Sequence, residues 1–148
     1  MKGLLTCLAV LIAMPLVADK AAKVYSRAEV ENELATCLKL PGAPDFLCYE
    51  TAAHHARDVG FCNEIVKLKD REGNPLTKAH EQCCRNVAAR FGDKPSLCDA
   101  VATQGGKDYC LTGVARFTKD RQVCELIVSK SQKANCEFYS KFNSGATP

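Results

Sequence analysis

Eight of the ten cysteines of this 148-residue chain follow a regular spacing over most of its length. From Cys84 onward the steps between cysteines are 14, 12, 14 and 12 residues, ending at Cys136. The step from Cys48 to Cys62 is again 14, whereas the step from Cys62 to Cys84 is 22 and so contains ten additional residues. Alternation of this kind is typical of a repeated structural unit, here of 26 residues with one insertion.

Small and apolar residues recur in the same register, which supports a shared structural unit. Five residues after a leading cysteine stand Ala53, Ala89 and Ala115, and three residues after a middle cysteine stand Ile65, Val101 and Ile127. The insertion falls near Gly73-Asn74-Pro75, residues typical of a loop. We expect this inserted loop, Lys67 to Lys78, to be exposed and available for contacts.

Each half of the repeat is long enough for about three helical turns and a short connection. Asp58 and Asp120 stand four residues before a cysteine, where a carboxylate can cap a helix. Asp93 stands five residues before Cys98, and Pro95 suits a first helical turn. We therefore expect helices to begin at these positions.

Helix ends are predicted at Gly92 and at Gly105-Gly106, and a turn is predicted near Gln132. Before the repeats, Ser26 to Glu29 forms a capping box that opens a helix. The apolar face of that helix consists of Val30, Leu34, Cys37 and Leu38. No alternating pattern of β-branched residues predicts strands, so we expect an all-α fold of short antiparallel helix pairs stacked as a disulfide-stapled α-solenoid.

The N-terminal residues resemble an export signal. Lys2 precedes the apolar run Leu4 to Met14, and Pro15 lies near its end. The run is shorter than the roughly 20 residues of a spanning helix, although a retained membrane anchor is the alternative to cleavage. We expect a signal peptide over residues 1–18, and hence a secreted or periplasmic protein in an oxidising compartment.

These patterns divide the chain into four predicted segments. They are a signal peptide (1–18), an N-terminal segment with a capping helix (19–36), a cysteine-rich helical repeat domain (37–142) and a flexible tail (143–148). We expect no stable membrane insertion once the signal is removed.

Eight cysteines in register predict four local disulfides across the turns. The proposed pairs are Cys37–Cys48, Cys62–Cys84, Cys98–Cys110 and Cys124–Cys136. The alternative joins equivalent helices of neighbouring repeats, as Cys98–Cys124 and Cys110–Cys136. Cys83 lies outside the register and is expected to be a free thiol or to form an intermolecular bridge in a homodimer, unless it takes the place of Cys84 opposite Cys62.

In architecture, residues 37–142 resemble tetratricopeptide-like and Sel1-like arrays. The repeats of those families run about 34 to 36 residues, and their motifs do not fit this chain. The resemblance therefore implies stacked helix pairs and transfers no functional residues.

Few residues suggest a catalytic, redox or metal-binding role. His54 and His55 lie with Glu50 and Asp58 at helical spacing, and such neighbours can hold a metal but also arise by chance on helix surfaces. His80 lies three residues before Cys83, and nearby Lys78 and Arg85 are predicted to favour a thiolate there. No C-x-x-C metal or haem motif, catalytic triad or phosphate-binding loop is present. We assign no catalytic residue and no metal, and keep His54 and His80 as low-specificity candidates.

The net charge of +3 does not favour nucleic-acid binding. We expect an exported protein-interaction or structural module that binds an unknown protein partner without a cofactor, and enzymatic activity is not indicated. One alternative is a small thiol- or metal-handling protein centred on Cys83 and His80. A second alternative is an inhibitor of a secreted enzyme.

Overall fold

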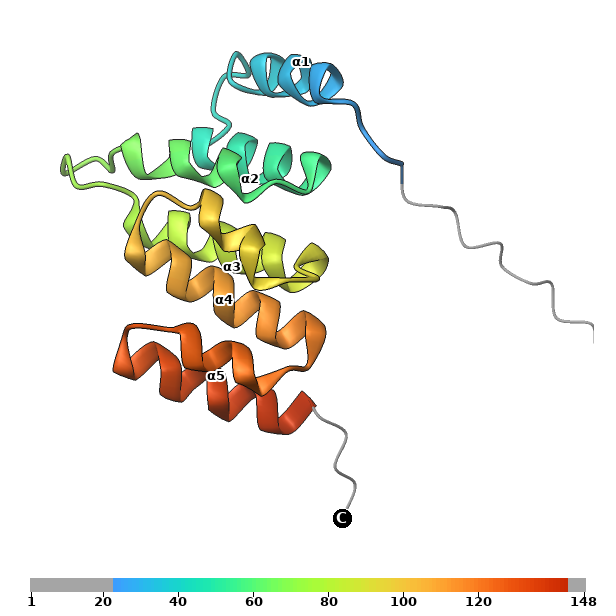
Figure 1. The fold of residues 1–148 in the computed structure, drawn as a ribbon. Helices are drawn as coiled ribbons and strands as arrows, with labels where there is room; N and C mark the ends of the chain where they lie inside the picture. The colour runs from blue at the N-terminus through green and yellow to red at the C-terminus, as the bar shows by residue number, and fades with distance from the viewer. Residues whose placement is uncertain (1–22, 144–148) are drawn as a thin grey trace, which may run out of the picture.

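The computed structural model describes residues 23–143, which are mostly helical and contain no β-strand (Figure 1). The all-α prediction is confirmed for these residues. The predicted signal peptide and residues 144–148 of the predicted tail lie outside them. None of the described helices is long and apolar enough to cross a membrane. The elements are α1 (Arg27–Cys37), α2 (Asp45–Ala56), η1 (Val59–Lys67), α3 (Thr77–Phe91), η2 (Pro95–Ala100), α4 (Gln104–Thr118), η3 (Arg121–Leu126) and α5 (Lys130–Asn143), where η denotes a 3-10 helix.

Helices α2 to α5 lie side by side in chain order and all run in the same direction (Figure 1). Helix α1 runs the opposite way and packs on α2. The segments that contain η1, η2 and η3 return the chain from the end of one α-helix to the start of the next. Each of the helices α2, α3 and α4 is therefore followed by a 3-10 return segment, where the sequence predicted pairs of similar helices.

The length of the return segments explains this difference. Helix α4 has 15 residues and is about 22 Å long. Only residues 119–129 are available to return the chain to the start of α5, and as an α-helix they would rise about 16 Å. A 3-10 helix rises about 2 Å per residue, and extended flanks rise more, so this geometry covers the distance.

Most of the predicted helix starts are present. The Ser26 hydroxyl accepts a hydrogen bond from the Glu29 amide, and the Glu29 carboxylate accepts one from the Ser26 amide at 2.8 Å. Asp58 and Asp120 cap η1 and η3 by accepting from amides two residues later, each at 2.8 Å. The prediction for Asp93 is wrong, since Lys94 precedes the first residue of η2 and no side chain caps it.

The predicted helix end at Gly105-Gly106 is also wrong. Both glycines lie in the first turn of α4, where the Thr103 hydroxyl accepts a hydrogen bond from the Gly106 amide at 3.1 Å. A Cβ atom on Gly106 would lie 2.4 Å from Cε1 of His80 in α3. The glycine is therefore needed for close packing against the histidine rather than for ending a helix. Gln132 likewise lies within α5 rather than at a turn.

Within residues 23–143 the structure contains four disulfides, and three of them have the predicted pairing: Cys37–Cys48, Cys98–Cys110 and Cys124–Cys136. The Cα atoms of the four pairs lie 5.7 or 5.8 Å apart, within the normal range for a disulfide. Cys62, however, is bonded to Cys83, and Cys84 is a buried free thiol. The predicted roles of Cys83 and Cys84 are therefore exchanged.

The position of each cysteine within its helix explains the exchange. Cys83 is the seventh residue of α3, as Cys110 is of α4 and Cys136 of α5. The buried alanine of α3 is shifted by one residue in the same way. It is Ala88 rather than Ala89, the alanine that the cysteine spacing predicted. The connection between α3 and η2 is one residue longer than the connection between α4 and η3. The cysteine spacing in the sequence therefore points to Cys84 instead of Cys83.

The core consists of small aliphatic side chains and cysteines. Ile65, Val101 and Ile127, which the register predicted as apolar positions, are all buried. Helices α3 and α4 approach closely at Gly113, where a Cβ atom would lie 2.4 Å from the Arg85 carbonyl oxygen. The inserted residues form an exposed hairpin beyond η1, closed by an isolated bridge between Lys69 and Pro75.

Candidate functional site

The predicted thiol centre is part of the packed interior. His80 is fully buried, with Nε2 3.6 Å from Sγ of Cys84 and Nδ1 3.5 Å from the Thr103 hydroxyl. Burial raises the pKa of the Cys84 thiol to about 12, so the thiol stays protonated at neutral pH and is a poor nucleophile. Since Cys83 is bonded to Cys62, a homodimer bridged through Cys83 does not fit this structure.

The three residues considered as metal ligands together with His54 have separate partners. Nδ1 of His55 lies 2.8 Å from the Glu33 carboxylate, and the Glu50 carboxylate accepts a hydrogen bond from Asn86 at 3.0 Å. Asp58 caps η1. Within residues 23–143, no group of three or more His, Cys, Asp or Glu side chains is arranged to hold a metal ion.

A more distinctive site is a depression of about 300 Å³ that spans three helices. We call it the arginine–tyrosine groove. Its lining comes from α3, α4 and α5, which run in parallel and so present side chains of successive units next to one another. The lining residues are Arg85, Tyr109, Thr112, Arg116, Gln132, Asn135 and Tyr139.

Two buried polar side chains connect the helices beneath this groove. The Gln132 side-chain amide donates a hydrogen bond to the Thr112 hydroxyl at 3.0 Å, and the hydroxyl donates to the Asp108 carbonyl at 3.0 Å. Thr112 and Gln132 are 3% and 8% exposed, so each of these groups depends on the other for its hydrogen bond. The link fixes the spacing of α4 and α5 and gives the groove a rigid base.

The Arg85 guanidinium has unused hydrogen-bonding capacity. Its Nε is buried and has no hydrogen-bond partner among the described residues. The guanidinium lies over the ring of Tyr109, 6.0 Å from its centroid. A buried donor without a partner costs free energy unless a ligand or water satisfies it, which makes this atom a candidate ligand contact.

The groove also carries uncompensated positive charge. Neither Arg85 nor Arg116 forms an ion pair with a carboxylate in the part of the chain that the structure describes. Planar guanidinium groups bind carboxylates and phosphates through paired hydrogen bonds. Tyr109 and Tyr139 add flat amphipathic surfaces of the kind enriched in protein interfaces. The arrangement suits an anionic group presented on a larger molecule.

Sequence analysis did not find this groove. Its residues are spread from position 85 to position 139 and come from three helices, so they form no local motif. Arg85 was considered only as a neighbour of Cys83. No local pattern could have revealed it, because the groove depends on how α3, α4 and α5 lie next to one another.

Comparison of the chain with protein-family models, with curated proteins and with solved structures found no match. The function is therefore inferred from the fold and from the groove.

Proposed function

We propose that this protein is an exported protein-interaction module, built as a short α-solenoid, that binds an acidic segment of a partner protein in the arginine–tyrosine groove. The observation that carries the proposal is the pair Arg85 and Arg116, whose guanidinium groups have no carboxylate partner among the described residues. No catalytic step is part of this proposal.

The spacing of equivalent residues supports the solenoid reading. Cys110 and Cys136 are 26 residues apart and occupy the same position in α4 and α5. Cys83 and Cys110 are 27 apart, and the two 3-10 helices η2 and η3 begin 26 residues apart. Units of nearly constant length that contact their neighbours define a solenoid, and such stacks present extended surfaces for partner proteins.

The disulfides support export. Four bonded pairs within residues 23–143 are stable in an oxidising compartment and rare in the cytosol. Together with the apolar N-terminal run, they favour a secreted or periplasmic location. An inhibitor of a secreted enzyme is a special case of the same function, in which the partner is an enzyme.

The acidic character of the partner follows from the chemistry of the groove. A carboxylate placed between Arg85 and Arg116 would satisfy the unpartnered Nε of Arg85 and neutralise two positive charges. The amide groups of Gln132 and Asn135 lie in the same lining and can hydrogen-bond to a peptide backbone. An extended segment with a Glu, an Asp or a terminal carboxylate fits this description.

The test uses the oxidised protein and two labelled peptide pools of equal length. One pool contains Asp and Glu at fixed positions and the other contains Asn and Gln there. We expect the acidic pool to bind, and Arg85→Gln and Arg116→Gln each to weaken binding about tenfold, the effect of losing one charge-assisted hydrogen bond.

The matched control is Arg71→Gln, which removes the same charge from the exposed hairpin outside the groove. It should leave binding unchanged. Equal binding of the two pools, or equal loss in all three variants, would contradict the proposal.

A further inference from the structure

A second depression, of about 460 Å³, lies at the other side of α3 from the arginine–tyrosine groove, between the N-terminal segment and the ends of α2 and α3. We call it the Phe91 pocket. Its lining contains no carboxylate. The lining residues are Lys23, Tyr25, Thr51, His54, His55, Arg57, Arg90 and Phe91.

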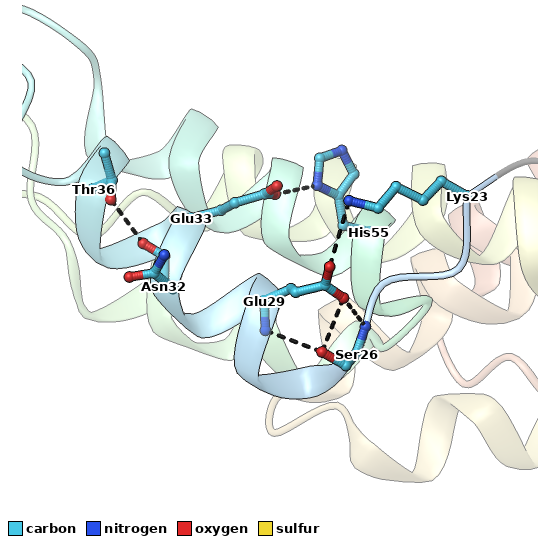
Figure 2. A network of polar contacts seen from close by, with 7 residues as sticks. All are labelled: Lys23, Ser26, Glu29, Asn32, Glu33, Thr36 and His55. Atoms are coloured by element: carbon cyan, nitrogen blue, oxygen red, sulfur yellow. Dashed lines mark hydrogen bonds and ion pairs between the residues drawn. The ribbon is translucent and has the colours of Figure 1, made fainter.

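The two acidic side chains of α1 near this pocket are already paired (Figure 2). Glu29 lies 3.5 Å from Lys23 and also accepts hydrogen bonds from Ser26. Glu33 lies 2.8 Å from His55, whose ring stacks on Tyr25 with 4.2 Å between the centroids. These contacts use the carboxylates of α1 on the N-terminal side of the pocket and leave the cations on its other side unpaired.

Arg57 and Arg90 are those cations. Both guanidinium groups lie over the ring of Phe91, 5.2 and 5.6 Å from its centroid. Neither forms an ion pair within the part of the chain that the structure describes. Two like charges gathered around one ring repel each other, and an anion bound between them would remove that repulsion.

The position of these arginines has a structural explanation as well. Arg57 caps the C-terminus of α2, and Arg90 is in the last turn of α3. Cations at helix C-termini are stabilised by the helix dipole without any ligand. This accounts for the arginines, but it does not account for the histidine that lies beside them.

His54 supplies the independent observation. Its Nδ1 is buried and has no hydrogen-bond partner among the described residues, and its ring meets Phe91 edge-on at 6.0 Å. Burial lowers the pKa of His54, Arg90 and His55 lower it further, and Glu50 acts in the opposite direction. A neutral imidazole can donate one hydrogen bond from Nδ1, and an oxyanion in the pocket would accept it.

We propose that the Phe91 pocket binds a phosphate or sulfate group, with Arg57 and Arg90 as its charged ligands and His54 as a further hydrogen-bond donor. The tetrahedral oxyanion of either group offers several acceptor oxygens, which suits donors supplied both by the end of α2 and by the end of α3. This site requires no acidic protein segment. It therefore goes beyond the proposed function and does not depend on it.

The test is calorimetric titration of the oxidised full-length protein with sodium phosphate and with sodium sulfate at pH 7, with sodium chloride as the reference. We expect saturable binding of at least one oxyanion and none of chloride. Arg90→Gln and Arg57→Gln should each weaken binding about tenfold. Tighter binding of phosphate would identify a phosphorylated ligand as the source, and tighter binding of sulfate a sulfated one.

Two controls separate this site from the arginine–tyrosine groove. Arg71→Gln should leave oxyanion binding unchanged, and so should Arg116→Gln, which is expected to weaken only the acidic peptides. In NMR spectra the ring nitrogens of His54 should shift on titration, whereas those of the buried His80 should not. Absence of saturable binding of either oxyanion, or loss of binding in Arg116→Gln but not in Arg90→Gln, would overturn the proposal.

Discussion

Asp108 of α4 accepts the backbone amide of Ser129 at 2.8 Å, so that a buried carboxylate holds the turn that begins α5. Its other oxygen accepts the amide of Val128 at 3.2 Å and the side-chain amide of Gln104 at 2.9 Å. Asp108 is only 2% exposed, and these donors take the place of water around its charge. Asp108 therefore links α4 to the start of α5. The contact lies where the return segment that contains η3 ends.

Replacing Asp108 with alanine should lower the free energy of unfolding by about 2–4 kcal/mol, because the amides of Val128 and Ser129 and the side-chain amide of Gln104 lose their charged acceptor. Asp108→Asn keeps one acceptor oxygen and should cost less. The measurement is chemical denaturation of the oxidised protein. Asp99→Ala, at an exposed position, is the control, and an equal loss in that variant would mean that the buried carboxylate has no special role.

Gly113→Ala should destabilise the protein by about 1–3 kcal/mol through overpacking. Its Cβ atom would lie 2.4 Å from the Arg85 carbonyl oxygen and 2.7 Å from Cβ of Ala88, so α3 and α4 would have to separate. Gly105→Ala is the matched variant in the same helix. There the Cβ atom meets only the end of the flexible Glu81 side chain, and thermal unfolding should change little or rise slightly.

Cys84 should resist alkylation in the folded protein at pH 8, because burial raises its thiol pKa to about 12 and also blocks access. After denaturation without reduction, it should be the described cysteine that takes up the label. Mass spectrometry of the non-reduced digest should then find the Cys62–Cys83 linkage. A label on Cys83 would instead support the pairing of Cys62 with Cys84.

Acidification should destabilise the fold through His80. Burial lowers the pKa of this histidine in the folded state, so the unfolded chain binds a proton more readily than the folded chain does. Stability should therefore be greatest above the unfolded value of about 6.5 and fall as the pH drops below it, by at most about 1.4 kcal/mol per pH unit from this residue.

The check is the free energy of unfolding measured between pH 8 and pH 5. His80→Gln should be less stable throughout, since a packed ring is lost, but its profile should be flatter than that of the unchanged protein. An equally steep profile in the variant would show that His80 does not cause the acid sensitivity.

The parts of the fold that were predictable from the sequence are those encoded by neighbours in the chain. Ser26, Asp58 and Asp120 cap helices through amides two or three residues away, and their spacing is visible in the sequence. Three disulfides were predicted because each spans a single turn. The 3-10 character of the return segments was not predicted, since it depends on the length of the helices that they must cover.

Two of the errors arise from contacts between helices that are distant in the sequence. The pair Gly105-Gly106 suggests a helix stop, although Gly106 is small because His80 packs against it from another helix. The error at Cys84 has a different origin, the additional residue after α3, and Cys84 occupies the position in α3 that the buried Leu111 occupies in α4. The lining of the arginine–tyrosine groove likewise depends on how α3, α4 and α5 are stacked, and no single segment of the sequence contains it.

The order of the disulfides determines what a protease can release. The four covalent rings follow one another along the chain without overlapping. A cut at Arg71, in the exposed hairpin, falls inside the ring closed by Cys62 and Cys83 and leaves both pieces joined. A cut after Arg90 falls between rings and divides the protein into two separate chains. Because the extra residues lie inside a ring, a single cut in this exposed hairpin does not detach any part of the molecule.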